Sequence, residues 1–163
     1  MSGAPPTRSL DHASLTVPDL DVAVAFFTDV LGAVELYRRS LAPRSDPEAM
    51  VVSFRAHPDA GFRLVKLDLG GTGLELFEYS APDQRTDPPR NCDVGGSHLG
   101  FVVPDLGAAI ARAAAHPGVR VLVSPQRLPD GHPLAGRTWV YLLTGWGQQL
   151  ELVCDAGRRR DPS

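Results

Sequence analysis

Two similar stretches of the chain alternate between apolar and polar residues, LDHASLTVPDL at residues 10–20 and GSHLGFVVPDL at residues 96–106. A period of two residues predicts a strand in each stretch. The proline that follows removes a backbone donor and ends strand pairing, and the aspartate after it is suited to cap a helix. Apolar residues then recur at helical spacing, and we expect Gly32 and Gly118 to end the two helices.

The chain therefore repeats itself. When the sequence is aligned with itself at an offset of 86 positions, His12 aligns with His98, and the Pro-Asp-Leu tripeptide that begins at Pro18 aligns with the one that begins at Pro104. Such repetition indicates that one supersecondary unit is used twice. Each unit is predicted to contain a strand, a helix and about three further strands. These further strands are expected at residues 32–39, 50–55, 62–68 and 73–79 in the first unit and at 118–125, 137–143 and 148–154 in the second.

This order predicts an α+β protein built from two βαβββ modules. The first module is expected over residues 9–80 and the second over residues 97–155, with a linker at 81–96 that is rich in Pro, Asp and Arg. Each module alone has too little apolar surface to be stable, so we expect the two to pack together. Residues 156–163, with the basic run Arg158–Arg160, are expected to form a disordered tail.

The composition excludes several classes of protein. Hydrophobic residues make up 43% of the chain and charged residues 21%, and the formal net charge is -3, which gives no reason to expect nucleic acid as a partner. No apolar stretch approaches the roughly 18 residues of a membrane span, and no signal peptide is visible. We expect a cytoplasmic protein without a membrane partner, in which Cys92 and Cys154 are reduced.

Four polar side chains share the strand faces that do not pack beneath the helices. His12 and His98 lie opposite the apolar residues of their strands, and both modules end in Leu-Glu-Leu, which places Glu75 and Glu151 opposite their flanking leucines. If the two sheets curl around a common cleft, two imidazoles and two carboxylates converge there. That donor set suits a divalent Zn, Fe, Mn, Co or Ni ion. The alternative is that these are ordinary surface or core residues, with both glutamates at exposed edges.

The segments that carry this pattern resemble the vicinal oxygen chelate superfamily, which includes glyoxalase I and methylmalonyl-CoA epimerase. They are DHASLTVPDLDVAVAFFTDVLGAVEL with LELFEY, and SHLGFVVPDLGAAI with GWGQQLELV. The resemblance implies a half-open, eight-stranded mixed sheet around a divalent metal, a small-molecule substrate bound through two neighbouring oxygens, and a homodimer. The metal ligands that it implies are His12, Glu75, His98 and Glu151.

Three features depart from the family pattern. Thr16 stands where glyoxalase I usually carries an arginine that helps to bind glutathione, which argues against lactoylglutathione lyase activity. The sequence TGWG at residues 144–147 replaces a frequent Asp-Pro, without affecting a ligand. The Pro-rich insertion at residues 41–49 suggests a surface for a substrate or partner particular to this protein.

A site with two histidines and two glutamates favours an enzyme that removes a proton beside a carbonyl, hence an isomerase, epimerase or lyase. We expect Glu151, rather than Glu75, to be the base, although their sequence environments do not distinguish them. One alternative is an Fe(II) enzyme that cleaves rings with oxygen, which needs only two histidines and one carboxylate. Another is a metal-free protein that binds a small molecule such as an antibiotic.

Other residues are weaker candidates for a site. His132 and Arg137 flank a predicted loop at residues 124–136 and could contact an anionic substrate, although a solvated loop is favoured. His57 lies in a Pro-adjacent turn and is expected at the surface. Glu78 and Cys154 fall on the opposite strand faces from Glu75 and Glu151 and are left out of the site. An aromatic pocket wall could be formed by Phe77, Tyr79, Trp139, Tyr141 and Trp146, although core packing is favoured for these residues.

Overall fold

A computed structural model describes residues 9–155, so the predicted tail at 156–163 lies outside the described residues. The chain divides into two compact units between Thr86 and Asp87, inside the segment predicted as the linker. Both units are α+β, as predicted, and their sheets are open rather than closed. No helix in the described part of the chain is long and apolar enough to cross a membrane.

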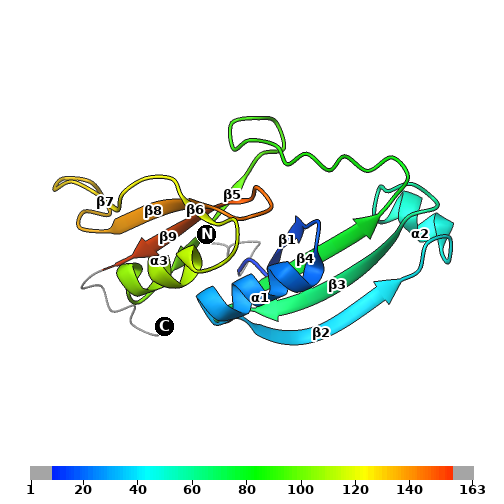
Figure 1. The fold of residues 1–163 in the computed structure, drawn as a ribbon, viewed down its shortest axis with the longest axis horizontal. Coiled ribbons are helices and arrows are strands. Elements are labelled where there is room, and N and C mark those ends of the chain that lie inside the picture. The colour runs from blue at the N-terminus through cyan, green and yellow to red at the C-terminus, as the bar shows by residue number, and fades with distance from the viewer. Residues whose placement is uncertain (1–8, 156–163) are drawn as a thin grey trace, which may run out of the picture. The chain divides into compact units, whose positions relative to one another are not determined.

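The first unit contains a four-stranded mixed sheet with the order β1-β4-β3-β2 (Figure 1). Strand β1 pairs in parallel with β4, and the other neighbours are antiparallel. Helix α1 packs against β3 and β4. The elements in the described part of this unit are β1 (His12–Thr16), α1 (Leu20–Leu31), β2 (Val34–Leu41), α2 (Pro47–Val52), β3 (Gly61–Asp68) and β4 (Gly73–Ser80).

The second unit repeats this topology. Strand β5 pairs in parallel with β9, the sheet has the order β5-β9-β8-β6, and the short strand β7 pairs with β8. Helix α3 packs against β9 and β6. The elements in the described part of this unit are β5 (His98–Val102), α3 (Leu106–Ala114), β6 (Arg120–Val121), β7 (Gln126–Arg127), β8 (Thr138–Leu143) and β9 (Gln149–Cys154).

The predicted aspartate caps are present in both units. The Asp19 side chain accepts a hydrogen bond from the Val22 amide at 3.0 Å, and Asp105 accepts one from the Ala108 amide at 2.9 Å. Each satisfies an amide that the first turn of a helix leaves without a partner. Gly32 ends α1 in the left-handed conformation, with φ of 70°, as expected of a glycine at that position.

Three sequence-based element predictions are wrong. Residues 50–55 form no strand, because Asp46 caps a helix through the Ala49 amide and Pro47 occupies its first turn, so that α2 begins there. The strand expected at 118–125 is limited to β6, and pairing with β8 resumes only at β7, after Pro125, which has no amide to donate. Helix α3 ends at Ala114, before Gly118.

The core follows the alternation of the two Leu-Glu-Leu tripeptides. Leu74 and Leu76 in β4 have exposed fractions of 1% and 0%, and both leucines of β9 are fully buried. Glu75 and Glu151 are only partly buried. The leucines thus pack on the helix side of each sheet, and the glutamates lie on the other side.

This alternation predicts unequal effects of substitutions at neighbouring positions. Leu74→Ala should lower the free energy of unfolding by about 2–5 kcal/mol, because it leaves a cavity in a close-packed core. Glu75→Gln, which keeps the shape of a partly exposed side chain, should lower it by less than about 1 kcal/mol. Urea denaturation of the two variants measures the difference. Equal destabilisation would contradict the assignment of the two sheet faces.

Candidate active site

One histidine and one glutamate lie together on the sheet of the first unit. The register of β1 and β4 places Ser14 opposite Glu75, so that His12 is a diagonal neighbour of Glu75 on the same face. The His12 Nε2 atom lies 3.6 Å from Glu75 Oε2. The other ring nitrogen, Nδ1, lies 2.6 Å from Asp11 Oδ2. An ionised carboxylate only accepts, so Nδ1 carries the hydrogen, and in the neutral ring Nε2 presents a lone pair.

The second unit contains the same arrangement. Gly100 lies opposite Glu151 in the pairing of β5 and β9, and His98 is the diagonal neighbour. The His98 Nε2 atom again lies 3.6 Å from Glu151 Oε2. Its Nδ1 atom lies 3.2 Å from Asn91 Oδ1, an oxygen that only accepts, so Nε2 is again the nitrogen with the free lone pair. Gly100 has no side chain to contact the carboxylate, whereas a Cβ atom there would lie in van der Waals contact with Oε2, at 3.6 Å.

The spacing within each pair is suited to metal binding. Two atoms that are each about 2.1 Å from one ion lie roughly 3.0–3.6 Å apart, depending on the angle between them. Fixing the second ring nitrogen of a histidine with an oxygen acceptor is how proteins orient metal-binding imidazoles. Within residues 9–155, no cluster of three or more His, Cys, Asp and Glu side chains could hold an ion. Each unit therefore supplies one pair, and the convergence of both pairs on one ion stays a prediction.

The two glutamates have different neighbours across the sheet. Lys66, the only lysine in the sequence, pairs with Glu75 across β3 and β4, and its Nζ atom lies 3.6 Å from Glu75 Oε1. The Tyr37 hydroxyl donates to the same oxygen at 3.5 Å. In the second unit, Tyr141 takes the position opposite Glu151, and its ring contacts His98 edge to face at 5.4 Å. Glu75 thus has an ammonium group beside it, whereas the cross-strand neighbour of Glu151 is a phenol.

The charged groups around His12 and Glu75 shift the pKa values of their neighbours on the sheet. The hydrogen bond from His12, followed by the ammonium of Lys66, lowers the pKa of Asp11. Burial acts to lower the pKa of Lys66, but the hydrogen bond to Asp11 and the charges of Asp11 and Glu75 outweigh it, so that this pKa is raised. Burial, and then the charge of Glu75, raises the pKa of Tyr79. Lys66 therefore remains a cation at neutral pH.

Lys66 is a residue that the sequence analysis missed. A signal was available, because the residue interrupts the apolar positions Phe62 and Leu64 on one face of a predicted strand. Folding the strands at 62–68 and 73–79 into a hairpin places it opposite Glu75. The Asn91 contact had no such signal, because that residue lies in the irregular segment before β5.

The residues that the sequence analysis named as weaker site candidates make ordinary structural contacts. Glu78 faces away from Glu75 and accepts a hydrogen bond from the Leu20 amide at 2.7 Å, at the start of α1. Arg137 donates two hydrogen bonds to Asp155, at 2.6 and 2.9 Å, rather than extending from a mobile loop. His132 is exposed, and its ring accepts from the backbone two residues further on.

The fold and these pairs define a glyoxalase-like class of protein, and comparison with known proteins identifies the family. Residues 9–134 match the profile of the Glyoxalase/Bleomycin resistance protein/Dioxygenase superfamily, and the chain belongs to this superfamily. A relative from an Actinomyces species, named 2-epi-5-epi-valiolone epimerase, is 47% identical over 152 residues, which cover 93% of this chain and 81% of the relative.

Solved structures show the same fold at low sequence identity. A glyoxalase family protein from Bacillus cereus has a TM-score of 0.73 at 17% identity, with 94% of this chain and 97% of that chain covered. The fosfomycin resistance protein FosX from Listeria monocytogenes, in complex with Mn(II) and sulfate, has a TM-score of 0.56 at 17% identity and covers 91% and 93% of the two chains.

Proposed function

We propose that this protein is a metal-dependent epimerase that acts on a carbon next to a carbonyl group. The observation that carries the proposal is the repeated pair, in which a histidine Nε2 and a glutamate Oε2 lie 3.6 Å apart in both modules. The relative at 47% identity, which is named as an epimerase, supports the reaction class. In this proposal, His12, Glu75, His98 and Glu151 hold one divalent ion between the two modules.

The donor set fits such an ion. Two imidazole nitrogens and two carboxylate oxygens give four ligands of borderline hardness, which suit Zn, Fe, Mn, Co or Ni. FosX was solved with Mn(II), which makes manganese one candidate. When bound, the ion would act as a Lewis acid for the negative charge that develops on the carbonyl oxygen of the substrate.

The chain itself would move the proton. We assign Glu151 as the base: the carbon-hydrogen bond breaks, the proton goes to the Glu151 carboxylate, and the electron pair moves into the carbonyl group. A protonated Glu75, from the other module, is the candidate that delivers a proton to the opposite face of the carbon, which inverts the centre. The step leaves Glu75 ionised and Glu151 protonated, and proton exchange with water restores both groups. The contacts of Glu75 with Lys66 and Tyr37 support this division, because they restrain Glu75 more than Glu151.

Metal analysis of variants tests the ligand set. Wild-type protein should bind about one divalent ion per chain, and His98→Ala and Glu151→Ala should lose it, because each removes one ligand. His132→Ala is the matched control, since His132 is exposed and outside the site, and it should keep the metal. Mass spectrometry of the protein-bound metals measures the content. Stoichiometric metal in both site variants would contradict the ligand assignment.

Exchange with solvent deuterium tests the reaction. Incubation with 2-epi-5-epi-valiolone in deuterated water should place deuterium on the carbon next to the carbonyl, as measured by NMR. Glu151→Gln should slow this exchange by about 10²–10⁴-fold, because the amide cannot accept the proton. Consumption of oxygen during turnover would favour the ring-cleaving alternative. Tight binding without exchange or bound metal would favour the binding protein.

A further inference from the structure

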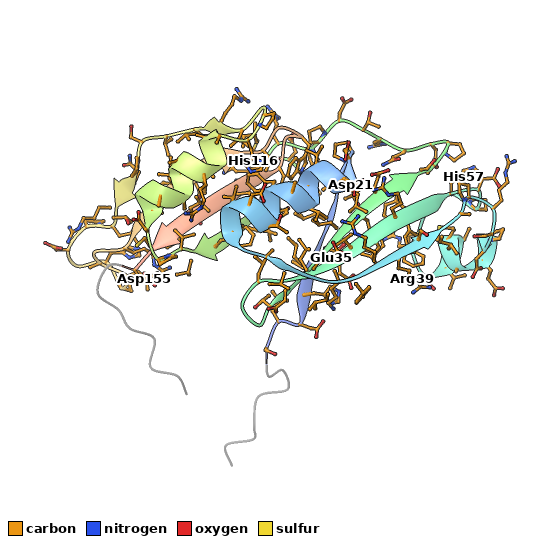
Figure 2. All side chains as sticks on the ribbon, turned by 60° about the horizontal axis from the view of Figure 1, so that its bottom comes forward. Asp21, Glu35, Arg39, His57, His116 and Asp155 are labelled. Atoms are coloured by element: carbon orange, nitrogen blue, oxygen red, sulfur yellow. The ribbon has the colours of Figure 1, made fainter. Side chains whose placement is uncertain are left out.

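The first unit contains a cavity of about 770 Å³ at the end of the sheet near α2. Figure 2 labels His57 at this end, in the loop that follows α2. Thr16 and Tyr79 line the cavity, and they lie on the same sheet face as His12 and Glu75, each four residues further along its strand, β1 or β4. The remaining polar walls come from the loop after α2 and the segment after β4.

The charged side chains that line the cavity give it a net positive charge. Arg55 and Arg85 line it, and neither forms an ion pair within the described residues 9–155. By contrast, Arg38 pairs with Asp21 at 2.8 Å, and Arg44 pairs with Asp59 at 3.0 Å. One carboxylate, Asp83, also lines the cavity, so the two guanidinium groups exceed it in charge.

Hydrogen-bond donors accompany this charge. The His57 Nδ1 atom accepts a hydrogen bond from the Asp59 amide at 3.1 Å, so its Nε2 atom carries the hydrogen and is free to donate. Gln84, Thr16 and Tyr79 line the same space and add amide and hydroxyl donors. The expectation that His57 is a surface residue was therefore incomplete, because it is partly buried in a cavity wall.

Arg55 occupies a backbone position that favours glycine. Its φ is 51°, in the left-handed region, and the Ala56 amide donates to the Met50 carbonyl at 2.8 Å, which closes the end of α2. Helices that end in this way usually have glycine at the left-handed position. An arginine there carries a conformational cost, and a strained residue beside a cavity suggests that its side chain has a function.

We infer that this cavity binds an anionic group, a phosphate or a carboxylate, and that this group belongs to the substrate. The inference rests on the proposed function, in which the reacting carbon lies near His12 and Glu75. At about 3.3 Å per residue, Thr16 lies roughly 7 Å along the strand from the position opposite Glu75, and Tyr79 lies roughly 13 Å from Glu75 itself. A carbonyl compound that carries such an acid group should therefore be a better substrate than the neutral 2-epi-5-epi-valiolone.

Site-resolved NMR with inorganic phosphate and with acetate tests the inference. In the full-length protein, at least one anion should shift the amide signals of residues 54–58 and 84–85. Arg55→Gly should weaken this binding about tenfold or more, because it removes a charged hydrogen-bond donor while suiting the left-handed backbone. Arg44→Gly is the matched control, since Arg44 also has a positive φ, of 65°, but does not line the cavity, and it should leave the affinity unchanged. Phosphate and acetate are titrated separately, so that the preferred anion identifies the acid group.

A second experiment distinguishes anion binding in the cavity from anion binding at the metal site. In His12→Ala, the metal should be lost while anion binding to the cavity persists. Anion-dependent shifts confined to residues near His12 and His98 would place the anion on the metal and overturn the inference. Equal weakening by Arg55→Gly and Arg44→Gly would also overturn it, as would the absence of any shift at residues 54–58 with either anion. All of these results are compatible with metal binding by the wild-type protein, so the inference can fail while the proposed function stands.

Discussion

The strict alternation of side chains along β4 and β9 is the constraint on which the site depends. Leu74 and Leu76 are buried beneath α1, and this requires Glu75 to lie on the other face of the sheet. A register shift of one residue would bury the carboxylate and expose the two leucines, and each of these changes is unfavourable. The energy of the core therefore determines where the acidic group of the site lies, and the second module applies the same constraint to Glu151.

Duplication gives two pairs with the same internal geometry but with different neighbours. Each imidazole is oriented by an oxygen acceptor at Nδ1, from Asp11 in one module and from Asn91 in the other. Lys66 then distinguishes Glu75, because its ammonium group lies beside that carboxylate, while Tyr141 lies opposite Glu151. A duplicated fold can in this way present two chemically unequal acids, which an epimerase requires if one removes the proton and the other returns it.

Local signals were sufficient to predict much of the fold from the sequence. The capping aspartates, the proline after each first strand and the alternating Leu-Glu-Leu tripeptides act over a few residues, and β3 and β4 lie within one residue of their predicted bounds. The helix α2 was not predicted because Met50 and the two valines after it favour a strand, whereas the residues that start the helix, Asp46 and Pro47, lie in the Pro-rich insertion.

Residues that depend on packing between elements were harder to predict. The contact between Lys66 and Glu75 requires the register of a hairpin, and the cavity beside Arg55 requires the end of α2 to lie near the segment after β4. The family resemblance predicted the four candidate ligands but neither of these features. Both lie on the same sheet face as His12 and Glu75.

X-ray absorption spectroscopy of the metal-loaded protein tests the central claim most directly. The account predicts a first shell of nitrogen and oxygen atoms at about 2.0–2.2 Å, with scattering from two imidazole rings. Replacement of either His12 or His98 by alanine should abolish metal binding and, with it, the imidazole scattering. Two imidazole rings that remain in both variants, or a shell that contains sulfur, would contradict a site shared between the two modules.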